Sequence, residues 1–214
     1  MPSDVNSASN RWQFHLRRIF ELTTISAIAA AVAAHFGPGS LLTSGGILLA
    51  WLNARGAFRS VQSGPWQIRI LWLAWATFLV SLALPSVKVF GPVQGANAAW
   101  FAAVAPLTAI AKGDALEPAL LAYLAIDVAN VLIALLPLLV WRLSNGRGQR
   151  FAAVLCTVMV SAWSIGWEGS MLVGYYTWCA SFWLALVAIP VRASTLLTMV
   201  AMAFGVAVAE QWSS

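Results

Sequence analysis

Asp127 lies within an apolar run and has two further polar side chains near it at helical spacing. Tyr123 precedes it by four residues and Asn130 follows it by three, so on an α-helix the three side chains share one face. A carboxyl group with these neighbours can bind a proton, a cation or a substrate amine. The same groups can instead form hydrogen bonds to a neighbouring helix. The stripe predicts either an ion or substrate site or an interhelical clamp, and we expect the clamp.

Two other ionisable side chains, His35 and Glu168, are expected near the outer surface of the protein. His35 stands close to Gly37-Pro38-Gly39, and Glu168 lies in a glycine-bearing turn between two apolar runs. An enzyme acting on lipids would need acids or histidines at such a surface. A structural histidine and a solvated loop carboxylate are the simpler roles, and we expect these. The sequence shows no metal-ligand spacing and no glycine loop for phosphate, so we expect no metal and no cofactor.

The composition places these side chains in a membrane protein. Of the 214 residues, 61% are hydrophobic and 9% are charged, whereas about a quarter of the residues in a soluble domain are charged. So few charges exclude a water-facing surface, and the high hydrophobicity excludes disorder. The net charge of +5 comes mostly from arginines between apolar runs, which is typical of a membrane protein. We therefore expect a lipid bilayer around the chain and no nucleic-acid partner.

Apolar runs long enough, or nearly long enough, to cross a bilayer occur seven times. They are Phe20–Phe36, Leu41–Leu52, Ile68–Leu84, Pro118–Trp141, Phe151–Trp167, Leu172–Val191 and Ser194–Ala209. The second run has only 12 residues and either crosses or forms a re-entrant hairpin with the first. An eighth run, Ala96–Ala111, is interrupted by Pro106 and is expected on the outer face. The predicted fold is all-α: a polytopic transmembrane helix bundle of about seven spans plus one interfacial or re-entrant outer-face helix.

The arginines orient this predicted bundle. They form four groups: Arg11, Arg17 and Arg18; Arg55, Arg59 and Arg69; Arg142, Arg147 and Arg150; and Arg192. With a cytoplasmic N-terminus and seven alternating spans, all four groups face the cytoplasm, provided that the segment 96–111 does not cross. Residues 1–214 then form a single integral membrane domain. It has a cytoplasmic tail over 1–18, an outer-face loop and interfacial segment over 85–117, and its C-terminus outside.

Several short motifs run through the middle of the chain. They are Leu84-Pro85, then Gly91 and Gly95, then Trp100, then Asn130, and finally Gly174-Tyr175-Tyr176-Thr177-Trp178 with Ser181. In this order they resemble a broad group of small multi-pass bacterial membrane proteins, over about residues 68–190. Val131 follows the asparagine here, where that group has proline. The resemblance implies a helical membrane fold in the bacterial inner membrane, and it implies no activity.

Three functions are compatible with these features. The first, which we favour, is a non-catalytic inner-membrane protein that acts through binding: a subunit of an envelope complex, or an interaction protein of the immunity or defence type. Its partners would be other membrane proteins or further copies of itself. The second is a small transporter or channel subunit with Asp127 as the ion or proton site. The third is a membrane-embedded enzyme acting on lipid, for which His35 and Glu168 are the available groups.

Overall fold

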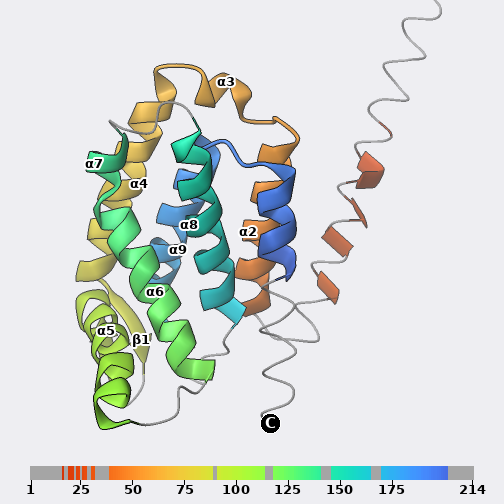
Figure 1. Cartoon of the computed structure of the whole chain (residues 1–214). Coiled ribbons are helices and arrows are strands. Elements are labelled where there is room, and N and C mark those ends of the chain that lie inside the picture. Colours follow the sequence, from red (N-terminus) through yellow and green to blue (C-terminus); the bar gives the residue numbers. More distant parts are fainter. Residues whose placement is uncertain are drawn as a thin grey trace, which may run out of the picture.

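The computed structural model describes residues 16, 19–21, 23–24, 26–27, 30–31, 39–88, 91–113, 118–140, 146–164 and 170–201. Within these residues the chain is mostly helical, with one small sheet (Figure 1). The helices are α2 (Gly39–Ala54), α3 (Arg59–Gln62), α4 (Trp66–Ala83), α5 (Gly95–Lys112), α6 (Pro118–Ala134), α7 (Leu136–Val140), α8 (Arg147–Ser164) and α9 (Val173–Ala188). Residues 193–201 are also helical. The predicted helical class is confirmed.

Helix α9 lies at the centre of the bundle, where α4, α2 and α8 pack around it (Figure 1). Its sequence is apolar on all sides, and a helix of this kind is stable only when it is surrounded. Phe182, Ala185 and Leu186 are fully buried, and they pack against core residues of the neighbouring helices such as Leu71 and Leu155. The core of the protein is therefore built around α9.

The outer surface of the helices carries large apolar side chains. Trp72, Leu73, Leu79 and Val80 of α4 are all more than 40% exposed. By length and composition, α4 is the one helix among the described residues that qualifies as a membrane span. Three shorter helices, over Leu41–Ala54, Tyr123–Ala134 and Val173–Ala188, are also apolar.

The predicted run Pro118–Trp141 is divided into α6 and α7 at Leu135. Pro137 causes this break, because proline has no N–H to donate to the carbonyl of Ile133 and its ring crowds that turn. At the break, the carbonyl of Ala134 accepts a hydrogen bond of 3.2 Å from the indole Nε1 of Trp75. Pro106, which was expected to interrupt a run, instead lies buried inside a continuous α5.

A three-stranded antiparallel sheet joins segments far apart in the sequence. Its strands are β1 (Pro85–Lys88), β2 (Pro92–Gln94) and β3 (Ser170–Met171), in the order β2-β1-β3. The sequence predicted only an outer-face loop after Leu84, with no strand in it. Figure 1 shows β1 and α5 at one end of the bundle and α3 at the other. We call these the sheet end and the α3 end.

Six arginines of the described residues belong to the α3 end, where α2 and α9 finish and α4 and α8 begin (Figure 1). They are Arg55, Arg59, Arg69, Arg147, Arg150 and Arg192. Helix α5 starts from β2 at the sheet end, and its C-terminus is followed closely by the start of α6 at that same end. The helices thus run up and down between one arginine-bearing end and one end that carries the sheet.

Candidate functional site

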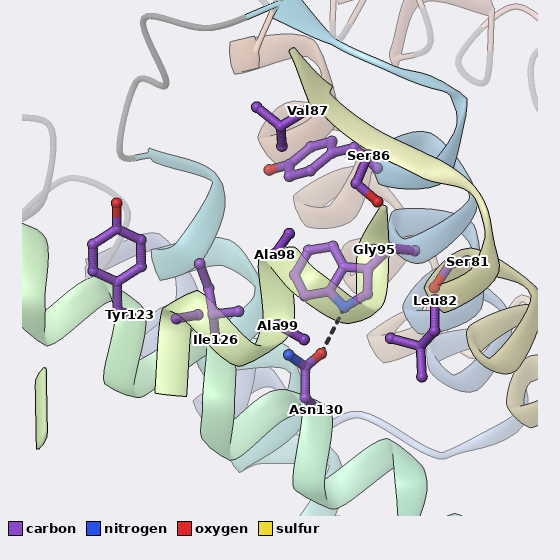
Figure 2. Close-up of a pocket in the computed structure, with 13 residues that line it drawn as sticks. Ser81, Leu82, Ser86, Val87, Gly95, Ala98, Ala99, Tyr123, Ile126 and Asn130 are labelled. Carbon is purple, nitrogen blue, oxygen red and sulfur yellow. Dashed lines mark hydrogen bonds between the residues drawn. The ribbon is translucent and has the colours of Figure 1, made fainter. Parts of the chain in front are cut away.

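A pocket lies at the sheet end, enclosed by α4, β1, α5, α6 and α9 (Figure 2). Its volume of about 540 Å³ counts the open solvent at its mouth as well as the space between these elements. One wall is the small-residue face of α5, with Ala98, Ala99 and Ala102. Two aromatic side chains of α9, Tyr175 and Trp178, form another part of the lining. The pocket is therefore mostly apolar, with an alanine wall and an aromatic wall.

Two glycines let α5 and α9 pack closely against the backbone between Ser81 and Ser86, and this packing sets the walls of the pocket. A Cβ atom on Gly95 would overlap the carbonyl oxygen of Ser81 and come within 2.9 Å of Ser86 Oγ. A Cβ on Gly174 would come within 2.6 Å of Ser86 Oγ and within 2.8 Å of the Leu84 carbonyl. Both positions require glycine, because any larger residue would push α5 or α9 away from this stretch.

Backbone hydrogen bonds hold the same junction. The N–H of Gly95 donates to the Leu84 carbonyl at 2.8 Å, and the N–H of Leu172 donates to the Ser86 carbonyl at 2.9 Å. Helices α5 and α9 therefore both start from fixed points on β1 or immediately before it. The motif residues Leu84-Pro85, Gly95 and Gly174, which are far apart in sequence, meet here.

Asn130 connects α6 to α9 at the pocket (Figure 2). Its Oδ1 accepts a hydrogen bond of 2.8 Å from the indole Nε1 of Trp178. Because an indole nitrogen can only donate, this bond fixes the orientation of the amide and turns Nδ2 away from the indole. No described residue accepts a hydrogen bond from that Nδ2. Asn130 thus presents an amide donor to the pocket.

Trp178 is itself held by aromatic contacts along α9. Its ring centroid lies 4.7 Å from that of Phe182 and 5.7 Å from that of Tyr175. Trp178 is 8% exposed, so most of this ring is inside the protein. The aromatic wall of the pocket is therefore a packed, fixed surface.

The residues of the predicted polar stripe occupy different surroundings. Tyr123 and Asn130 line the pocket, and Ile126 lies between them on the same face of α6 (Figure 2). Asp127 is half-buried one position further along the helix and is not a lining residue. In this part of α6, the hydrogen bond to another helix is the one that Asn130 accepts from Trp178. His35 and Glu168 lie outside the described residues.

Sequence analysis missed a second polar cluster, at the α3 end. Helix α9 ends before Pro190, which has no N–H for the carbonyl of Leu186. The buried side chain of Asn53 supplies a replacement donor: its Nδ2 donates to the carbonyl of Leu186 and, at 2.7 Å, to that of Ile189. Its Oδ1 accepts from the backbone N–H of Val191 at 3.2 Å.

Two glutamines complete this cap. Gln62 Nε2 donates to Asn53 Oδ1 at 2.9 Å and to the Val187 carbonyl at 3.2 Å. Gln67 Nε2 donates to the Ala188 carbonyl at 3.0 Å. Three side-chain amides thus satisfy the last carbonyls of α9, which helices otherwise leave without partners. Proline directly after an apolar run is a sequence signal for the end of α9, but the three amides are more than 120 residues away from the carbonyls that they cap, so no local pattern pairs them.

The described residues contain no group of three or more His, Cys, Asp or Glu side chains that could hold a metal ion. The polar groups that line the pocket are instead hydroxyls and one amide, on Ser81, Ser86, Tyr123, Tyr175 and Asn130. These groups form hydrogen bonds without a charge. Comparison of the chain with protein-family models, with curated proteins and with solved structures gave no match.

Proposed function

We propose that this chain is a non-catalytic, multi-pass inner-membrane protein with about seven spans that acts by binding. The apolar surface of α4 supports a lipid environment, because large exposed apolar areas are rare on soluble monomers. In the proposed orientation the α3 end faces the cytoplasm and the sheet end faces outward, with the C-terminus outside. The gathering of six arginines at the α3 end supports this orientation.

Two tryptophan–arginine pairs at the α3 end fit the same orientation. The guanidinium of Arg55 lies 4.8 Å from the ring centroid of Trp51, and that of Arg69 lies 5.0 Å from the ring centroid of Trp66. Tryptophan favours the level of the lipid headgroups, and arginine favours the cytoplasmic side. We place the inner bilayer surface at these pairs.

The observation that carries the proposal is the sheet-end pocket. Ligand sites are mostly apolar hollows with a few fixed polar groups, and this pocket has an aromatic wall, an alanine wall and the oriented amide of Asn130. Its hydroxyls and amide are suited to holding a ligand or the membrane-embedded part of a partner. The partner would be a membrane component, either another protein of an envelope complex or a lipid.

Filling the pocket tests this proposal. Ala99→Trp places an indole against the aromatic wall, whereas Ala111→Trp places the same side chain on the exposed face of the same helix. In a deletion strain, we expect Ala111→Trp to restore the wild-type phenotype and Ala99→Trp to fail, at equal levels in the membrane. Full restoration by Ala99→Trp would refute a role for the pocket in function.

A transporter or channel subunit is the second candidate, because Asp127 lies half-buried on α6 beside Ile126 of the pocket. An ion or proton site needs the carboxylate, so Asp127→Asn would then insert normally and abolish function. The binding proposal expects Asp127→Asn to retain function. Complementation of the deletion strain, with membrane levels measured in parallel, distinguishes the two.

A further inference from the structure

The sheet-end pocket lies close to the outer end of the helices that form it. Trp178 is five residues after the first residue of α9, about 8 Å along the helix, and Ser81 is two residues before the last residue of α4. The 18 residues of α4 extend about 27 Å, close to the ~30 Å thickness of the bilayer hydrocarbon. In the proposed orientation the pocket is therefore near the level where lipid ester groups meet their acyl chains.

The two walls of the pocket fit a hydrocarbon chain. Ala98, Ala99 and Ala102 carry only methyl groups, so the α5 wall is shallow along its length. Trp178 and Tyr175 add ring surfaces to the lining. Methylene groups of a linear chain gain dispersion contacts from both kinds of surface.

The Nδ2 donor of Asn130 supplies a polar anchor beside these apolar walls. Its Oδ1 is committed to Trp178, so Nδ2 is fixed in direction, and no described residue accepts its hydrogen bonds. A donor in mostly apolar surroundings is costly unless an acceptor reaches it. An ester carbonyl is an acceptor without a competing donor, and it is joined directly to an acyl chain.

Resting on the proposed binding function, we infer that the sheet-end pocket binds one acyl chain of an outer-leaflet phospholipid, with the ester carbonyl accepting a hydrogen bond from Asn130 Nδ2. A phospholipid fits the depth of the pocket in the proposed orientation, the apolar chemistry of its walls and the amide donor of Asn130. A transmembrane helix of a protein partner offers leucine or phenylalanine side chains for the walls, but its backbone carbonyls already accept hydrogen bonds within the helix.

The test uses the full-length protein reconstituted in phosphatidylethanolamine vesicles that contain a diazirine-labelled phosphatidylethanolamine, with the diazirine on one acyl chain. After illumination, proteolysis and mass spectrometry locate the adducts. We expect adducts on the pocket faces of α5 and α9 in the wild type. Ala99→Trp should reduce the pocket adducts to background, whereas Ala111→Trp should leave them unchanged. Adducts on the exposed face of α4 should persist in both variants.

The anchor is tested separately with Asn130→Leu, and Trp178→Phe is its control. Asn130→Leu removes the amide donor together with the acceptor for Trp178, whereas Trp178→Phe removes only the bond between the two side chains and leaves the donor in place. For Asn130→Leu we expect pocket labelling to need about three- to tenfold more probe, the range for losing one hydrogen bond. Equal labelling of the pocket in wild type and Ala99→Trp would overturn the inference. If labelling is equal and Ala99→Trp also fails to complement the deletion strain, the pocket still has a binding function, and its partner is a protein rather than a lipid.

Discussion

Replacing Asn53 with leucine should destabilise the whole bundle, because one side chain holds the end of its central helix. Asn53 makes four hydrogen bonds: to the Leu186 and Ile189 carbonyls, from Gln62, and from the Val191 N–H. Leucine keeps the branched outline of asparagine but has no polar atom, so all four hydrogen bonds are lost. At about 0.5–1.5 kcal/mol for each bond, the free energy of unfolding should fall by about 2–6 kcal/mol. Domain stabilities are typically about 5–15 kcal/mol, so this is a large share.

The protein carries its own reporter for this measurement. Cys156 and Cys179 are 0% and 1% exposed, so a thiol-reactive fluorescent dye can reach them only on unfolding. In detergent, we expect Asn53→Leu to lower the melting temperature strongly. The control Ser63→Ala, at the end of α3, removes only an exposed local hydrogen bond to the Arg59 carbonyl and should melt like the wild type. An Asn53→Leu protein with wild-type melting would refute the capping role.

Two further predictions concern the sheet end. Gly95→Ala should lower the free energy of unfolding by about 1–3 kcal/mol in dye-monitored melting, because the added methyl group meets the Ser81 carbonyl. The control Gly91→Ala should be neutral, because a Cβ there has nothing within 4 Å. Equal effects of the two changes would contradict the packing argument. Trp178→Phe keeps an aromatic ring but removes the donor to Asn130, and Asn130→Leu removes the acceptor. Melting of these two single mutants and of the double mutant should give a coupling of about 0.6–1.7 kcal/mol, and zero coupling would mean that the bond contributes nothing.

The helices could be predicted from the sequence because apolar runs and their breakers are local signals. The predicted run Leu172–Val191 contains α9, and Ile68–Leu84 agrees with α4 within two residues at each end. The sheet could not be predicted in the same way. Its strands have two to four residues, too few for a periodic pattern, and Val87 pairs with Met171 from a distant part of the chain.

The candidate site was predictable only where helical spacing sufficed. Spacing placed Tyr123 and Asn130 on one face of α6, and both line the pocket. It gave no reason to separate Asp127 from them, because the packing of α6 against α5 and α8 decides which positions face the pocket. The pairing of Asn130 with Trp178, and the burial of Asn53 beneath the end of α9, depend on helices that are distant in sequence.

Cysteine labelling from outside the membrane tests the central claim most directly, namely that the sheet end with α5 faces outward and the α3 end faces the cytoplasm. Cysteines are placed singly at Asn97 and Lys112, exposed on α5, and at Ser60 and Ser194, exposed at the α3 end. With an impermeant maleimide on spheroplasts, we predict labelling at Asn97 and Lys112, and labelling at Ser60 and Ser194 only after permeabilisation. Labelling of Asn97 with protection of Lys112 would show that α5 crosses the membrane, and labelling of Ser60 in intact spheroplasts would contradict the orientation.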